Sequence, residues 1–170
     1  SLFPIFQYLE NTIKSRLALE LTQEIHIVPE LDIEHNASHL AAFIKTNELG
    51  KEDTLLLLLA LIPQLEPSFL NRILSEFLPN GGEFPEFGGV KGKNHRGILP
   101  TGETFLYIVY GNDIQKRLEG MEFLESESKL TDQKFVGLEG LGKGEPKLSG
   151  RLILDEECFV KVTSGKVIKP

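Results

Sequence analysis

The sequence predicts an α+β domain that is mainly helical and has a small antiparallel β-element near its C-terminus. Two observations support this fold class. Apolar residues recur at helical spacing through residues 3–79, whereas the last third of the chain contains short apolar stretches flanked by glycine and proline. The 170 residues, of which 41% are hydrophobic, suffice for one core, so we expect a single domain over residues 1–170. Two subdomains, residues 1–79 and 80–170, are the alternative.

The first helix is expected over residues 3–21. Its apolar side chains recur every three or four positions and therefore share one helical face. They are Phe6, Leu9, Ile13, Leu17 and Leu21. The next segment, residues 23–33, contains Pro29 and is too short and too interrupted for a helix, so we expect it to run extended.

A second helix is expected to begin at a capping residue, either Asn36 or Ser38, and to reach Leu49. Gly50 would then terminate it, because glycine readily adopts the left-handed conformation found just after many helices. These boundaries rest on a side-chain oxygen at the start and on a glycine at the end.

A leucine-rich segment lies at the centre of the helical region. Residues 51–54 give it a charged first turn, and a run of five leucines follows. Leucine on every face predicts a buried, central helix. Pro63 is expected to end this helix, because the residue before a proline disfavours helical geometry. Pro67 would open a fourth helix that reaches Leu78 and carries one broad apolar face.

Helical periodicity stops between residues 80 and 101, where six glycines and two prolines predict a loop of about twenty residues. Loops of this length are uncommon in compact domains and are often functional. Residues 101–110 have the pattern of a buried helix capped by Thr101, with a strand as the alternative because β-branched and aromatic residues are frequent. Residues 113–123 are expected to be helical or irregular.

The last third of the chain predicts a small sheet and a final helix. Residues 134–138 and 151–154 are short, apolar and bounded by turn-forming residues, so we expect two strands that pair antiparallel. Asp155 is expected to cap a helix over residues 156–163, and Gly165 would close it. Residues 166–170 are expected to leave the domain in an extended conformation.

Composition and charge exclude several classes of protein. The formal net charge of −7 disfavours a non-specific nucleic-acid binder, because neutralising phosphates requires a basic surface. Cys158 is the single cysteine, which excludes an internal disulfide; its apolar neighbours indicate a buried thiol in a reducing compartment, so we expect a cytoplasmic protein. The longest apolar run, residues 55–63, is about half of the ~20 residues that cross a bilayer, so no membrane insertion is expected.

The glycine-rich segment 88–94 invites comparison with a phosphate-binding loop, in which glycines expose backbone N–H groups to an anion. The match fails at three points. Three residues rather than four separate the relevant glycines, Asn94 replaces the required Ser or Thr, and no strand pattern precedes the loop. We therefore expect no nucleotide or other cofactor at this segment.

The same loop concentrates positive charge in an acidic chain. Lys91, Lys93, His95 and Arg96 lie within six residues, next to acidic and aromatic side chains. Such contrast can steer an acidic protein partner toward the loop. The alternative is a solvated loop whose aromatic residues attach it to the core.

Neither a metal site nor a catalytic site is legible. His35 and His39 are four residues apart and would share a helix face, but Asn36 stands where the zincin pattern requires Glu, and no third ligand is evident. The Gly-x-Ser-x-Gly turn of hydrolases is absent, and the many carboxylates are expected to be solvated. We expect no catalytic residues; a small hydrolase or transferase would need a pocket that joins the glycine-rich loop to His26, His35 or His39.

Four stretches of the chain resemble a known family. They are LLLLLALIP, PSFLNRIL, EFGGVKGKNHRGILPTGETFLYIVYGND and EPKLSGRLILDEECFVKVTSGKVIKP. Together they resemble the N-terminal region of AAA-type ATP-binding proteins that are encoded with phage-tail-like contractile injection systems, commonly in Bacteroidetes-type bacteria. The resemblance extends over residues 54–170 and is most specific over residues 86–104, whereas the first fifty residues share only the helical pattern.

The resemblance implies a winged-helix-like interaction and regulatory module, followed by a C-terminal ATPase core beyond a junction near Lys169 and Pro170. The module would position the ATPase on injection-apparatus subunits or regulate its assembly, with oligomers forming through the ATPase. The family-like block and the basic cluster together define a proposed interaction loop, for which buried glycine and proline turns are the architectural alternative. Its residues are Glu86, Phe87, Gly88, Gly89, Lys91, Gly92, Lys93, His95, Arg96, Thr101 and Glu103.

A winged helix that binds nucleic acid is the chief rival interpretation, since helices followed by a hairpin fit that plan. Such a domain needs a basic recognition helix. The expected fourth helix offers only Arg72, so no nucleic-acid partner is expected.

Overall fold

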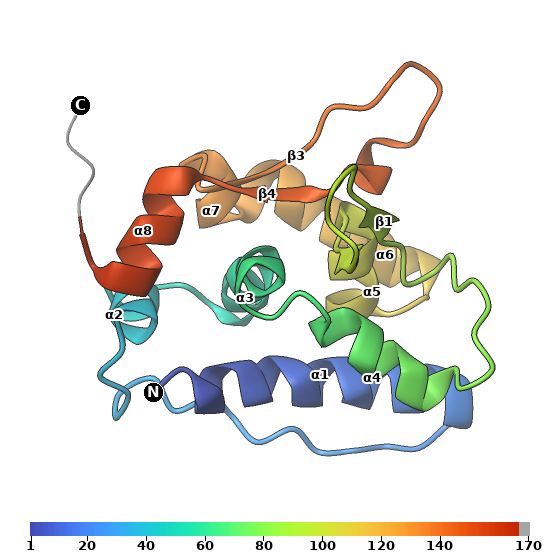
Figure 1. Cartoon of the computed structure of the whole chain (residues 1–170), viewed down its shortest axis with the longest axis horizontal. Helices are drawn as coiled ribbons and strands as arrows, with labels where there is room; N and C mark the ends of the chain where they lie inside the picture. The colour runs from blue at the N-terminus through green and yellow to red at the C-terminus, as the bar shows by residue number, and fades with distance from the viewer. Residues whose placement is uncertain (167–170) are drawn as a thin grey trace.

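The computed structural model describes residues 1–166. These residues form a mainly helical domain with a small antiparallel sheet near the C-terminus, as predicted (Figure 1). A second two-stranded sheet, β1–β2, lies in the segment that was predicted to be a loop. In chain order the helices and strands are α1 (Phe3–Thr22), α2 (His39–Thr46), α3 (Lys51–Leu65), α4 (Phe69–Phe77), β1 (Val90–Lys91), β2 (Ile98–Leu99), α5 (Gly102–Tyr110), α6 (Ile114–Glu122), the π-helical turn η1 (Phe123–Glu127), α7 (Lys129–Asp132), β3 (Val136–Leu138), the 3-10 turn η2 (Lys147–Ser149), β4 (Leu152–Leu154) and α8 (Glu156–Ser164).

Helix α3 forms the centre of the core, as the leucine run predicts. All eight residues from 55 to 62 are buried, because other elements cover this helix on every side. Figure 1 shows α3 end-on between α1 on one side and α7 with the β3–β4 hairpin on the other, while α2 and α8 pack together at one end. Buried residues from both halves of the chain belong to one continuous cluster, since α5 and β4 also pack against α3.

Local capping explains where several helices begin. Ser38 accepts a hydrogen bond from the Ala41 amide at the start of α2, and Asp155 accepts one from the Cys158 amide at the start of α8. Gly165 follows α8 in the left-handed conformation, as predicted. The Cys158 side chain is buried, and burial raises the pKa of its thiol to about 12.

Three predicted helix boundaries are wrong. Helix α2 ends at Thr46, and Gly50 is instead the N-cap residue of α3. Pro63 lies inside α3, which continues to Leu65. A proline in the last turn removes only one hydrogen bond, and the complete burial of the preceding residues holds the helix together there. Pro67 lies in the turn before α4, so it does not open that helix.

The middle and end of the chain agree more closely with prediction. Residues 102–110 form helix α5 and not the alternative strand, and Thr101 is its N-cap, which with Thr104 forms a reciprocal capping box. Strands β3 and β4 pair antiparallel with Val136 opposite Leu154. The expected extended exit over residues 166–170, and with it the expected junction at Lys169 and Pro170, falls outside the described residues except for Lys166.

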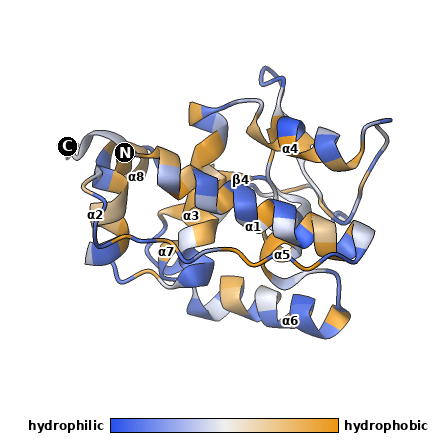
Figure 2. Ribbon diagram, turned by 90° about the horizontal axis from the view of Figure 1, so that it is seen from below, coloured by the Kyte–Doolittle hydropathy of each residue, from blue (hydrophilic) through white to orange (hydrophobic). Residues whose placement is uncertain are grey.

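Residues 24–33 form most of the extended segment that the sequence predicts, with neither helix nor strand assigned to them, whereas Gln23 is in the left-handed conformation that ends α1. Figure 2, seen from below, shows this segment running beside α1 across one face of the molecule. Among the described residues, no single helix combines the length and apolar character needed to cross a membrane. Within residues 1–166, α3 and α4 meet those criteria only when taken together, with a bend of 106° between them.

Candidate interaction surface

The glycine-rich segment is an ordered hairpin attached to the core by aromatic side chains. Strands β1 and β2 pair antiparallel, with Val90 opposite Leu99. Below the hairpin, the buried ring of Phe87 packs edge-on against Tyr107 of α5 at 5.8 Å between ring centroids, and Phe84 does so at 5.3 Å. Burial raises the pKa of the Tyr107 hydroxyl, so the tyrosine against which both phenylalanine rings pack stays neutral. The base of the hairpin is therefore rigid.

Several residues of the proposed interaction loop are architectural. Gly89 donates its backbone N–H to the Thr101 hydroxyl at 3.3 Å, which joins the loop to the cap of α5. Gly88 has a φ of +69°, and a Cβ there would lie 2.7 Å from the Cβ of Glu103. A side chain at Gly97 would collide with the carbonyl oxygen of Pro67. These close approaches explain why glycine occupies the block that carries the family resemblance.

The charged residues of the loop face solvent. Lys91, Lys93 and Arg96 are exposed, and none of them forms an ion pair with another residue in the range 1–166. His95 is half-buried, and its Nε2 atom is buried without a hydrogen-bond partner among the same residues. We call Lys91, Lys93 and Arg96 the basic hairpin cluster. The exposed Glu86 lies at the base of the hairpin rather than on its strands.

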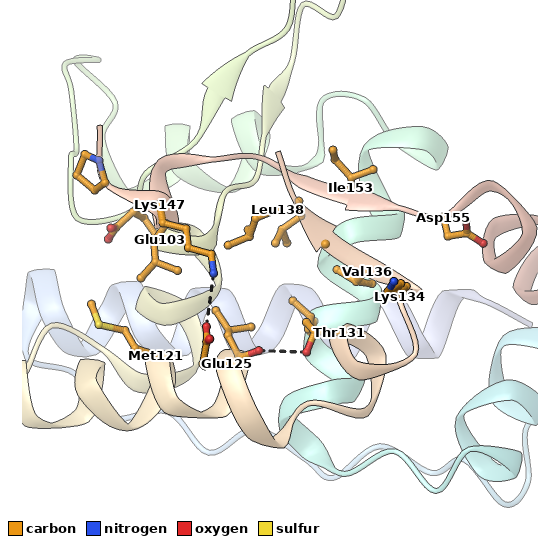
Figure 3. A pocket seen from close by; sticks show the side chains of 16 residues that line it. Glu103, Met121, Glu125, Thr131, Lys134, Val136, Leu138, Lys147, Ile153 and Asp155 are labelled. Carbon is orange, nitrogen blue, oxygen red and sulfur yellow. Dashed lines mark hydrogen bonds and ion pairs between the residues drawn. The ribbon is translucent and has the colours of Figure 1, made fainter. Parts of the chain in front are cut away.

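A second feature, which the sequence did not reveal, is a groove of about 700 Å³ between the α6–η1 helix and the β3–β4 hairpin (Figure 3). Glu103 of the predicted loop lies at one end of it and forms an ion pair with Arg117 of α6. Most of the remaining lining is apolar. Its apolar side chains are Leu56, Met121, Leu124, Val136, Leu138, Pro146, Leu148, Leu152 and Ile153.

Charged side chains of both signs surround the groove. Across its mouth, the Lys147 ammonium donates to a Glu125 carboxylate oxygen at 3.4 Å, and both side chains are largely exposed (Figure 3). Lys134 and Asp155 lie at the other end. Because its interior is apolar and its polar groups lie at the rim, the groove is suited to binding apolar side chains or the apolar part of a ligand.

Sequence reasoning missed the groove because its walls come from residues as far apart as Leu56 and Asp155. The available signal was Met121, which with Ile114 and Leu118 forms a series of exposed apolar residues on the mainly polar helix α6. It is 38% exposed and lies one helical turn after Leu118, which is 51% exposed.

The histidines do not form the arrangements that the sequence allowed. His35 lies in the turn before α2 and pairs with Asp32 at 2.8 Å, whereas His39 is the first residue of α2, so the predicted shared helix face is wrong. Figure 1 places α2 at the opposite end of the domain from β1, so these two histidines do not meet the glycine-rich loop. No cluster of three or more His, Cys, Asp or Glu side chains within residues 1–166 is arranged to hold a metal ion.

Comparison with known proteins returns no significant match to a family model, a curated protein or a solved structure.

Proposed function

We propose that this chain is the non-catalytic N-terminal interaction and regulatory module of a bacterial AAA-type ATPase that acts with a phage-tail-like contractile injection system. The observation that carries the proposal is the basic hairpin cluster, three exposed cations that form no ion pair within residues 1–166, on a hairpin whose base is fixed to the core. The family resemblance of residues 86–104 covers the same hairpin and supplies the type of ATPase.

The physical basis is charge contrast on a rigid support. The chain as a whole carries a formal charge of −7, so a local basic cluster orients an acidic partner toward one place on its surface. Because Phe87 and Thr101 already fix the hairpin, binding requires little further ordering of its backbone. The acidic partner is an injection-apparatus subunit or the attached ATPase core, and the apolar groove offers a second contact.

A winged-helix-like arrangement belongs to the same proposal, with the β3–β4 hairpin as the wing. A nucleic-acid-binding winged helix is less well supported, because the charge of Arg72 on α4 is already engaged. Its guanidinium donates to Glu10 at 2.8 Å and lies 5.5 Å from the centre of the Phe69 ring. The helix directly before β3 is α7, which has only four residues and is therefore too short to serve as a recognition helix.

The test is a pull-down with the domain from a lysate of the bacterium that encodes it. Wild type is compared with a Lys91/Lys93/Arg96→Glu variant and with a Lys45/Lys143/Lys161→Glu variant, which makes the same charge change at other exposed lysines. We expect wild type and control to recover injection-apparatus subunits or the ATPase core, identified by mass spectrometry. The hairpin variant should recover at least about tenfold less, a loss of about 1.4 kcal/mol.

Two outcomes would contradict the proposal. Equal recovery by the hairpin variant would remove the basic hairpin cluster from the interface. Recovery of DNA in place of these proteins, with strong dependence on salt, would favour the nucleic-acid-binding alternative.

A further inference from the structure

The extended segment after α1 has an unpaired backbone. Residues 23–33 contain no turn or bend, and no backbone–backbone hydrogen bond within residues 1–166 involves residues 25–32. Figures 1 and 2 show the segment lying along α1 on the surface, away from both small sheets. Free backbone N–H and C=O groups on an exposed, extended segment are a template for the addition of another strand.

The segment is held in this conformation by its contacts with the domain. The Ser15 hydroxyl of α1 donates to the carbonyl of His26 at 3.1 Å. Further along, Val28, Leu31 and Ile33 are half-buried. A binding partner therefore meets a strand that is already extended, and little conformational entropy is lost when it pairs.

Two isoleucines mark the accessible part of the segment. Ile25 is 84% exposed and Ile27 is 93% exposed, values unusual for side chains of this size and polarity. Because they are two residues apart on an extended chain, their side chains share one face and their backbone groups share one edge. The carbonyl of His26 faces Ser15 on α1, so the groups of Ile25 and Ile27 face the opposite, outer edge.

An antiparallel neighbour on that edge would exchange two hydrogen bonds with each isoleucine. Pro29 has no N–H, so it limits the pairing edge to the residues before it.

Charge selects the kind of partner. Glu24, Glu30, Asp32 and Glu34 are all exposed along this segment. His26, which belongs to the segment itself, pairs through its side chain only with Glu24 among the residues of the segment.

Nearby cations on α1 are already engaged, because Lys14 pairs with Glu10 and Glu76, and Arg16 pairs with Glu20. A second copy of the same segment would bring like charges together, and a nucleic acid would be repelled. A basic strand would gain favourable cross-strand pairs.

We propose that residues 24–28 are a strand-addition site for an extended, basic peptide of a partner protein, in which lysine or arginine alternates with β-branched residues. The site lies on a different element from the basic hairpin cluster and does not depend on the function proposed above.

The test begins with a display library of random nine-residue peptides that is panned on the folded domain. Binding is then compared for three proteins: wild type, Ile27→Pro, which lacks one backbone donor, and Ile27→Ser, which keeps the donor and loses the apolar side chain. Since Ile27 is almost fully exposed, both substitutions are expected to preserve the fold, which circular dichroism verifies.

We expect enriched peptides in which basic and β-branched residues alternate, with affinity at least about tenfold weaker for Ile27→Pro and closer to wild type for Ile27→Ser. Peptides N-methylated at alternate backbone positions should bind weakly, and the amides of Ile25 and Ile27 should exchange more slowly in the complex. The inference is overturned if no peptide is enriched, if enriched peptides are acidic, or if Ile27→Pro binds as tightly as wild type.

Discussion

A buried carboxylate joins two distant parts of the core, and its removal is a direct test of the fold. Asp53 lies in the first turn of α3 and is 4% exposed. It accepts a hydrogen bond from the Ser128 hydroxyl at 2.6 Å and another from the Lys129 amide at 2.9 Å. The Asp53 carboxylate thereby accepts hydrogen bonds at the N-terminus of α7, which begins about 75 residues later in the sequence.

The expected cost of Asp53→Ala follows from these two bonds. A hydrogen bond to a charged group contributes about 1.5–3 kcal/mol, and a buried donor left without a partner adds a penalty. Because the two bonds share one acceptor group, their effects are not fully additive. We expect a loss of about 3 kcal/mol in the free energy of unfolding, or about 6–12 °C in Tm for a domain of this size.

Urea denaturation followed by circular dichroism measures this loss. Glu52→Ala is the matched control, because Glu52 lies in the same turn of α3 and makes no side-chain hydrogen bond with any residue in the range 1–166; its effect should stay within about 0.5 kcal/mol. The double variant with Ser128→Ala should be less destabilised than the sum of the single variants, by about 1 kcal/mol. A loss below about 1 kcal/mol for Asp53→Ala, or fully additive effects, would refute the reasoning.

Two further predictions concern the base of the hairpin and the contact between α1 and α4. Gly97→Ala introduces a Cβ against a backbone carbonyl and should lower the free energy of unfolding, measured by urea denaturation, by about 1–3 kcal/mol. The control Gly140→Ala places a Cβ with no atom within 4 Å and should leave the stability nearly unchanged. Equal effects of the two substitutions would contradict the predicted collision. The hydrogen bond from Arg72, supported by Lys14, lowers the pKa of Glu10. Because this pKa is lowered in the folded state, the stabilisation is present above about pH 4.5 and is lost as the pH falls through the folded-state value. Glu10→Gln should therefore lower the free energy of unfolding by about 1 kcal/mol at pH 7 and by almost nothing at pH 3. A loss of stability that is the same at both pH values would show that the charge of Glu10 is not its cause.

The candidate surfaces differ in how far the sequence predicted them. Clustering of Lys91, Lys93 and Arg96 is visible in six residues of sequence, and the structure places all three at the surface. Phe87 and Thr101 were assigned to the same loop, with an architectural role as the alternative, and in the structure both are buried and hold the loop in place. A local pattern does not distinguish a side chain that contacts a partner from one that supports the turn.

The sequence by itself determined the elements that depend on short-range physics. Capping of α5 by Thr101 and of α8 by Asp155 involves residues within three positions of each other, and the buried centre of the fold follows from a run of leucines. These features need no knowledge of the remaining chain.

Tertiary structure decided the rest. The continuation of α3 past Pro63, the contact of Asp53 with α7 and the apolar groove all depend on packing between segments that are distant in sequence. The extended segment around Ile27 was predictable, but the absence of any neighbouring strand within residues 1–166 was not. Which surface is buried and which backbone edge stays free are properties of the assembled domain, because each depends on what the other elements cover.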